Sequence, residues 1–185
     1  MNRHEFVATR DDCLLLIIDI QQAMLKVIEM WADVVGKVNQ LSQAAEALGV
    51  PILLTEQYSK GLGQTIPEVV DQVRSPKVFY KEHFSACVET GFLPLIRSYR
   101  RSRIVMVGME THVCVLQTGL DLIREGFQLQ LVADGVASRT VRNRDTAIDL
   151  FREAGAVITS AEIVIFQWAV RANTEDFRRI LPIVK

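Results

Sequence analysis

Three side chains of complementary chemistry stand at or just beyond the ends of short apolar runs in this sequence. Asp19 closes one such run, Lys81 closes another, and Cys114 lies a few residues beyond a third. A thiol can attack an electrophilic carbon, a carboxylate can accept and return its proton, and an ammonium group can hold the developing charges in place. Together they are the groups that covalent catalysis by a cysteine needs.

The thiol is the most informative of the three groups. Cys114 falls in the segment that we expect to form the first turn of a helix. There the positive end of the helix dipole and the free backbone N–H groups should lower the pKa of the thiol and favour the nucleophilic thiolate. The same N–H groups, that of Cys114 among them, can receive an oxyanion. Many free cysteines are small buried hydrophobic residues, so position alone leaves both interpretations open.

Asp19 and Lys81 also allow structural explanations. A carboxylate beside buried apolar surface can act as a general base or acid, and it can equally cap the next helix or face water. A lysine at the end of a strand can hold Asp19 ionised or lower the pKa of a nearby thiol, but most lysines are simply solvated. A catalytic role for each residue is therefore supported only if the other two lie at the same edge of one sheet.

The elements that would position these residues alternate between short apolar runs and longer amphipathic segments. The runs predict strands at 13–19, 51–55, 77–81, 103–108, 127–133 and 156–159. Helical spacing and stop signals predict helices at 24–48, 91–99, 111–125 and 143–154, with further helical pieces at 161–168 and 174–181. This alternation predicts an α/β fold with three layers and Rossmann-type topology: a six-stranded parallel sheet with helices on both faces, in a single domain over residues 1–185. The carboxyl ends of the strands then share one edge, where sites form.

Composition narrows the function classes. The 185 residues carry a net charge of -1, which gives no electrostatic case for nucleic acid or a membrane surface as a partner. The longest apolar run is far shorter than the roughly 18 residues of a membrane span, and the N-terminus is polar. The three widely spaced cysteines form no disulfide framework, so a cytoplasmic location is expected. The three histidines lack metal-ligand spacing, and we expect neither a metal nor a cofactor.

The motifs around the three residues resemble those of the isochorismatase-like cysteine hydrolases, a superfamily that includes nicotinamidases, N-carbamoylsarcosine amidases and isochorismatases. The matching segments are Leu14 to Gln21, Lys81 to Ala86, Gly108 to Val115, Gln117 to Asp121 and Val132 to Gly135. The resemblance spans about residues 12 to 170. Within the superfamily, Thr55 to Tyr58 followed by Lys60 to Gly63 and Pro67-Glu68 is most similar to the isochorismatase-domain-containing proteins of unassigned substrate.

The resemblance implies specific roles. Cys114 would attack the carbonyl carbon of a small amide or related carbonyl compound and form a thioester, with Asp19 as general base and acid and Lys81 as the orienting and stabilising cation. A non-proline cis peptide bond is expected at Met109–Glu110, with the N–H groups of Glu110 and Cys114 receiving the oxyanion. Homo-oligomers are common in the superfamily, so a dimer or tetramer is expected, and the apolar stretch 164–168 is a candidate for contact with a second subunit.

Departures from the pattern are equally informative. Nicotinamidases carry an acid and two histidines after the second strand as metal ligands, whereas Glu56 to Gly61 contains no histidine. A metal-dependent nicotinamidase is therefore disfavoured. True isochorismatases replace the cysteine with a small residue, so Cys114 also argues against their vinyl-ether chemistry.

Candidates for substrate binding are Gln21, Tyr58, Leu62, Phe84 and His112. Two other readings stay open: a non-catalytic homo-oligomeric binding or scaffold protein that retains the three groups, and a redox role for Cys114 with Cys87 as a possible partner. Retention of all three groups favours the enzyme, because a scaffold does not need them.

Overall fold

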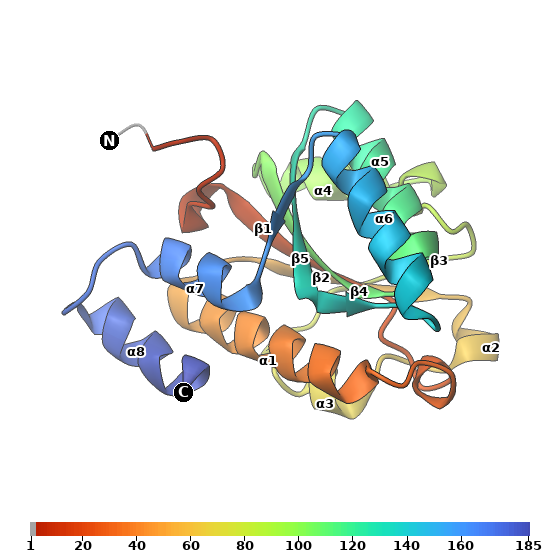
Figure 1. Ribbon diagram of the computed structural model, residues 1–185, viewed down its shortest axis with the longest axis horizontal. Helices are drawn as coiled ribbons and strands as arrows, with labels where there is room; N and C mark the ends of the chain where they lie inside the picture. The colour runs from red at the N-terminus through yellow and green to blue at the C-terminus, as the bar shows by residue number, and fades with distance from the viewer. Residues whose placement is uncertain (1–2) are drawn as a thin grey trace.

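A computed structural model describes residues 3–185 of the chain as three layers around one parallel sheet (Figure 1). The six strands run in the spatial order β3-β2-β1-β4-β5-β6, and every neighbouring pair is parallel. The strands are β1 (Cys13–Ile18), β2 (Ile52–Gln57), β3 (Val78–Lys81), β4 (Arg103–Met109), β5 (Gln128–Ala137) and β6 (Val157–Thr159). The expected α/β fold, with its six-stranded parallel sheet, is confirmed.

Helices cover both faces of the sheet. On one face lie α1 (Trp31–Leu48), α3 (Pro67–Val70), α7 (Ala161–Ala169) and α8 (Glu175–Val184). On the other lie α4 (Phe92–Ser98), α5 (Leu116–Arg124) and α6 (Val141–Glu153). The short helix α2 (Ser59–Leu62) lies beyond the carboxyl ends of the strands, at the margin of the sheet.

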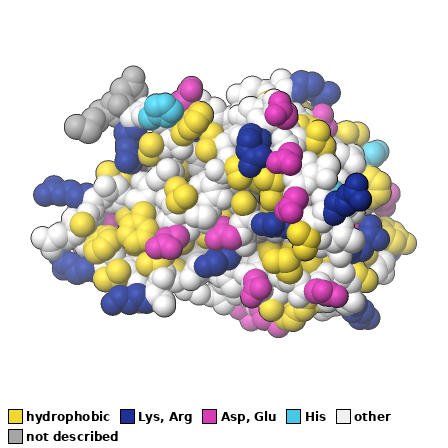
Figure 2. All heavy atoms as spheres, viewed as in Figure 1, with side chains coloured by type: hydrophobic (Ala, Val, Ile, Leu, Met, Phe, Trp, Pro, Cys, Tyr) yellow, Lys and Arg dark blue, Asp and Glu magenta, His cyan; other side chains and the backbone are white. Residues whose placement is uncertain are grey.

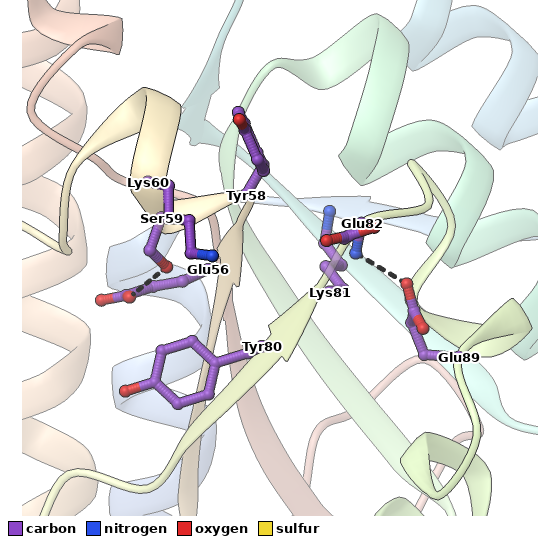
Figure 3. A pocket seen from close by; sticks show the side chains of 8 residues that line it. All are labelled: Glu56, Tyr58, Ser59, Lys60, Tyr80, Lys81, Glu82 and Glu89. Carbon is purple, nitrogen blue, oxygen red and sulfur yellow. Dashed lines mark hydrogen bonds between the residues drawn. The ribbon is translucent and has the colours of Figure 1, made fainter.

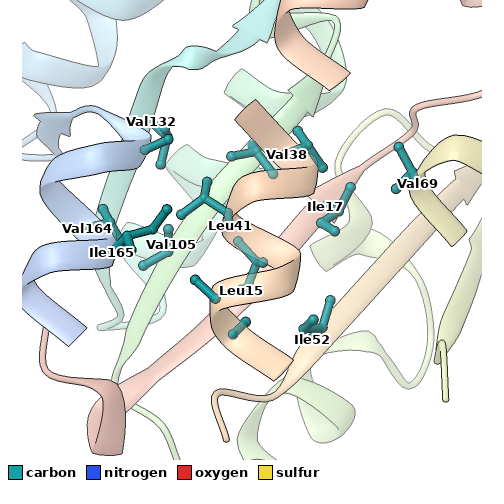
Figure 4. Packing of buried hydrophobic residues seen from close by; sticks show 14 of the residues in the cluster. Leu15, Ile17, Val38, Leu41, Ile52, Val69, Val105, Val132, Val164 and Ile165 are labelled. Carbon is teal, nitrogen blue, oxygen red and sulfur yellow. The ribbon is translucent and has the colours of Figure 1, made fainter. Parts of the chain in front are cut away.

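The apolar character of β1 follows from this sandwich. Side chains alternate across a strand, so Leu15 and Ile17 point into the core beneath α1, while Leu14 and Leu16 point into the core beneath α5 and α6. Figure 4 shows Leu15 and Ile17 packed against side chains from α1 and the neighbouring strands. A strand that is buried on both faces reads as an uninterrupted apolar run, and β1 has no exposed position.

The helix predicted over 24–48 begins later than expected. Met24–Lys26 forms a 3-10 turn, and α1 starts only at Trp31. The backbone N–H groups of Gln22 and Ala23 bond to the carbonyls of Gln64 and Leu62, which ties this stretch to the segment that follows β2. These tertiary contacts override the apolar spacing that suggested one continuous helix. The C-terminal boundary at Gly49, in the left-handed conformation, agrees with the prediction.

Three other boundaries of strands and helices differ from the predicted ones. Strand β2 continues through Gln57, where the sequence suggested a loop from residue 56, because its last two residues pair with β3. Strand β5 reaches Ala137 instead of ending near residue 133. The helix expected from Thr111 opens with a π-helical turn, Thr111–Val115, before α5 begins.

The surface shows charges of both signs intermingled over the face seen in Figure 2, in keeping with the near-zero net charge. Across residues 3–185, no helix is both long and apolar enough to span a bilayer. Most of the stretch 164–168 packs into the hydrophobic core, since Val164, Ile165 and Trp168 are fully buried. The large apolar side chains that α7 exposes to solvent are instead Ile163 and Phe166, at 51% and 40% exposure.

Candidate active site

The candidate residues meet where the winding of the sheet reverses. From β1 the chain moves outward through β2 and β3, and it then returns to pair β4 with the other side of β1. The crossovers on either side of β1 and β4 diverge, which opens a crevice at the carboxyl ends of these two strands. Asp19 directly follows β1, and Cys114 lies in the turn that follows β4.

Asp19 is fixed by both its backbone and its side chain. Its φ of 49° is in the left-handed region, which aspartate tolerates better than most residues. Carboxylate Oδ1 accepts a 2.6 Å hydrogen bond from Thr55 Oγ1, and Oδ2 lies 2.7 Å from Lys81 Nζ. The Asp19 and Lys81 side chains are 3% and 0% exposed, so their charges compensate each other away from water.

Lys81 lies behind Asp19 and has a full set of oxygen partners. Besides the carboxylate, Nζ donates to Gln57 Oε1 at 2.6 Å and to the carbonyl oxygens of His83 and Phe84 at 3.3 and 3.4 Å. A buried ammonium group that is surrounded by oxygen atoms stays in one place.

Cys114 sits in the π-helical turn and is 7% exposed. The peptide bond between Met109 and Glu110, just before this turn, is cis, as the resemblance implied. Gly108 allows the backbones of β1 and β4 to approach closely here, because a Cβ at this position would lie 2.1 Å from the Ile18 carbonyl oxygen.

The expected lowering of the thiol pKa is wrong. Burial and the neighbouring Asp19 carboxylate raise the pKa of Cys114 to about 12, while Lys81 acts in the opposite direction. The helix terminus does not outweigh the loss of hydration in this buried turn. The free protein therefore holds a neutral thiol beside a carboxylate, so a proton must move before the sulfur can act as a strong nucleophile.

Gln57 joins the lysine to the thiol, and no motif in the sequence marked it as a site residue. Its Oε1 accepts from Lys81 Nζ and lies 3.9 Å from Cys114 Sγ, while its Nε2 donates to the Glu82 carbonyl oxygen at 2.6 Å. Its backbone is held by Gln21, whose side chain accepts from Gln57 N and donates to Gln57 O. Gln57 was assigned to a loop, and only its inclusion in β2 places it beside Lys81.

A cavity of about 280 Å³ opens onto these groups. Asp19, Gln57 and Cys114 reach its surface. Its apolar wall is formed by Met24, Val27, Leu62, Phe84, Met109 and Val113. Arg139 and Glu110 add an ion pair to the lining, with Arg139 Nε 2.9 Å from Glu110 Oε2. The cavity is thus mainly apolar, with its polar groups gathered around the thiol.

The predicted substrate-binding residues separate into two groups. Leu62 and Phe84 line this cavity. Gln21 is fully buried and acts on Gln57, Tyr58 lines a neighbouring cavity, and His112 bonds to Ser138 through Nδ1. The structure does not bring these last three residues to the thiol.

A family model, that of the isochorismatase domain, matches residues 13–163. The chain belongs to the isochorismatase family. It is 36% identical over 176 residues to the secreted isochorismatase effector Isc1 of Phytophthora sojae, covering 93% of this chain and 84% of that protein. It is 34% identical over 174 residues to isochorismatase family protein 1A of Dictyostelium discoideum, covering 92% and 84% of the two chains.

Solved structures agree with this assignment. The structure described as MAR1 ribonuclease from Caenorhabditis elegans superposes with a TM-score of 0.90 at 29% identity, covering 96% of this chain and 91% of that one. This member of the isochorismatase family therefore shares the fold of that neighbour over nearly its whole length, and a shared fold leaves the substrate open.

Two features of this isochorismatase-family site had no clear signal in the sequence. Met24 and Val27 line the cavity because the chain between β1 and α1 folds over the site instead of forming a regular helix. Arg139 lies in the connection after β5, whose end the sequence placed too early. Within residues 3–185 no three His, Cys, Asp or Glu side chains gather in a group suited to holding a metal ion.

Proposed function

We propose that this isochorismatase-family hydrolase cleaves a small amide or related carbonyl compound through a thioester on Cys114. Asp19 serves as general base and acid, and Lys81 is the orienting and stabilising cation. The observation that carries this proposal is a cavity lined by both Cys114 and Asp19, with the Lys81 ammonium 2.7 Å from the Asp19 carboxylate.

The first half of the reaction forms the thioester. The thiol proton passes to Asp19 as the sulfur attacks the carbonyl carbon, and the carbonyl oxygen becomes an oxyanion. The backbone N–H groups of Glu110 and Cys114 receive that oxyanion. Asp19 then returns the proton to the nitrogen, the carbon–nitrogen bond breaks, and ammonia or an amine leaves.

The second half of the reaction restores the enzyme. Asp19 takes a proton from a water molecule, whose oxygen attacks the thioester carbonyl carbon. The carbon–sulfur bond then breaks, the carboxylic acid leaves, and the proton returns to Cys114. Lys81 keeps the carboxylate in place through both halves, and its positive charge lowers the pKa of the thiol toward that of the base.

The dimensions of the cavity support a small substrate. A volume of about 280 Å³ lies just below the usual range for small-molecule sites, which begins at about 300 Å³. The name of the nematode neighbour describes that protein as a ribonuclease. For this chain a narrow, largely apolar cavity favours a compact carbonyl compound over a polynucleotide.

The test is a panel of small primary amides, with ammonia release as the readout and mass spectrometry of quenched protein to locate the acyl group. Active amides should acylate the peptide that carries Cys114, and Cys114→Ala should abolish both signals. Cys87→Ala is the matched control, because burial also raises the pKa of Cys87 to about 12 and that thiol does not line the cavity. The control should keep wild-type turnover.

Several results would overturn the proposal. Ammonia release that survives Cys114→Ala would exclude this nucleophile. Absence of turnover and of acylation across the panel would favour the non-catalytic binding or scaffold protein. Chelators should leave activity unchanged, and activity that is lost on chelation and restored by zinc would contradict the metal-free mechanism. RNA belongs in the same panel as a substrate that should remain intact.

Assembly and location remain predictions from the sequence. A homo-oligomer is expected, and light scattering of the purified chain would measure its size. A cytoplasmic site of action is also expected, although the Phytophthora relative is described as a secreted effector.

A further inference from the structure

Glu89 is hydrogen-bonded to the turn that follows β3, residues 82–84. Its Oε1 accepts three hydrogen bonds: from the backbone N–H groups of Glu82 and His83, at 2.7 and 2.8 Å, and from His83 Nδ1 at 2.8 Å. Figure 3 shows Glu89 reaching across to the backbone at Glu82. Both residues line the cavity beside Tyr58, and neither lines the thiol cavity. One oxygen atom therefore fixes two successive backbone amides and one side chain.

The opposite side of the same turn holds the site. Three successive carbonyl oxygens, those of residues 82, 83 and 84, point the other way along the backbone. The first accepts from Gln57 Nε2 at 2.6 Å, and the other two accept from Lys81 Nζ at 3.3 and 3.4 Å. The orientation of Gln57 and Lys81 thus depends on the placement of this turn.

We propose that Glu89 is a positioning residue, which sets the Gln57 amide and the Lys81 ammonium for the reaction at Cys114 by clamping the turn 82–84. This inference rests on the proposed function. Glu89 does not line the thiol cavity, so it acts through the turn and not on the substrate.

The carboxylate suits this task. The backbone N–H groups of His83 and Glu82 lower the pKa of Glu89 to about 2, so the group is an anion at neutral pH. Hydrogen bonds to an ionised acceptor are stronger than neutral ones. The side chains of residues 82–84 are exposed, so apolar packing contributes little to holding the turn.

Glu89 is itself anchored to the helix of the nucleophile. It ends the 3-10 turn Ala86–Val88, and Ala86 N donates to Thr118 Oγ1 in α5 at 3.0 Å. Helix α5 continues directly from the turn that carries Cys114. The contacts of Glu89 therefore fix the position of Lys81 relative to that of the Cys114 thiol, although the two residues lie on segments that are distant in sequence.

The test compares Glu89→Ala, Glu89→Gln and the matched control Glu125→Ala. Glu125 also pairs with a basic side chain and has a side-chain exposure of 27%, against 21% for Glu89, but it lies at the far end of α5. The assays are kcat and KM with an amide that the wild type turns over, the rate of Cys114 acylation, and thermal unfolding.

In Glu89→Ala, kcat and the acylation rate should fall by about 10-fold to 100-fold, the range expected when a reacting group is displaced by roughly 1 Å. KM should change by less than about threefold, because no substrate contact is removed. Glu89→Gln keeps an oxygen for the two backbone N–H groups and should recover most of kcat. Glu125→Ala should match the wild type.

Equal kcat in Glu89→Ala and Glu125→Ala would overturn the inference, and so would failure of Glu89→Gln to recover activity while its unfolding temperature is normal. A wild type that neither turns over nor acylates at Cys114 would instead refute the proposed function. Because the wild-type measurement comes first, the two failures are distinguishable.

Discussion

The Lys81 ammonium and the Asp19 carboxylate lie 2.7 Å apart with side-chain exposures of 0% and 3%. The two residues come from different strand ends, so this pair exists only once the sheet has formed. Burying either charge without a partner would carry a large desolvation free energy, and the opposite charge of the other group compensates for that penalty. The pair links the stability of the sheet to the chemistry proposed at its edge.

Breaking this pair should destabilise the fold strongly. Lys81→Met and Asp19→Asn should each lower the free energy of unfolding by about 3–5 kcal/mol, because each leaves an unpaired buried charge. The double variant should lose much less than the sum, since it leaves neither charge behind. Urea unfolding of the four proteins measures the coupling, and additive losses would mean that the two charges do not compensate each other.

The reactivity of the thiol should separate the roles of the two charges. Because the pKa of Cys114 is raised to about 12, its alkylation by iodoacetamide should accelerate about tenfold per pH unit between pH 7 and 9. Asp19 raises this pKa and Lys81 lowers it. Asp19→Asn should therefore alkylate faster than the wild type and Lys81→Met more slowly, although both variants should hydrolyse amides poorly.

Peptide mapping provides the internal control for this experiment. Cys87 has a similarly raised pKa, caused by burial and by Asp121, and should respond to neither substitution. Slower alkylation of Cys114 in Asp19→Asn would show that the carboxylate assists thiolate formation even without substrate, contrary to the charge balance described above.

Most of the fold was predictable because it depends on short-range pattern. Strand β1 is apolar throughout and must be buried on both faces, and Gly49 marks the end of α1 wherever that helix begins. The order of strands and helices then brings Asp19, Lys81 and Cys114 to the same edge by topology alone. These parts of the prediction did not require knowledge of any side-chain contact.

The parts that failed depend on contacts between distant segments. Gln57 matters because Lys81 lies beside it, and the two residues are 24 positions apart in sequence, so no local pattern indicates that approach. The thiol pKa was predicted in the wrong direction because the helix terminus is visible in the sequence and the extent of burial is not. Met24 was assigned to a helix whose start is displaced by bonds to the segment after β2.

Helix α5, which follows the turn that carries Cys114, should tolerate no added side chain at Gly119. A Cβ there would lie 2.3 Å from a ring carbon of Phe151 and 3.0 Å from Leu129 Cδ2, so Gly119→Ala forces the helix away from its neighbours. We expect a loss of about 1–3 kcal/mol in the free energy of unfolding. Gly36→Ala in α1 is the control, because among residues 3–185 no atom lies within 4 Å of the added Cβ apart from its chain neighbours and the backbone of its own helix.

The control should change stability in the opposite direction. Alanine is a better helix former than glycine, so Gly36→Ala should stabilise the protein by about 0.5–1 kcal/mol. Both values come from urea unfolding. Equal effects at the two positions would mean that α5 can shift without cost, which would remove it as a rigid support for the thiol.

The clamp at Glu89 should also leave a signature in the pH dependence of stability. Its pKa is about 2 in the folded chain against an ordinary value of 4.5, so the folded state binds fewer protons than the unfolded state between these two values. The contribution of Glu89 to the free energy of unfolding is therefore complete above about pH 4.5 and declines as the pH falls toward 2.

Urea unfolding of wild type and Glu89→Gln at pH 7, 5, 4 and 3.5 should show the wild type more stable at pH 7 and the difference shrinking below pH 4.5. Glu125→Gln, which removes a carboxylate paired with Arg97, controls for the general loss of a surface charge. A difference that stays constant down to pH 3.5 would mean that the backbone amides of the turn do not depend on the charge of Glu89.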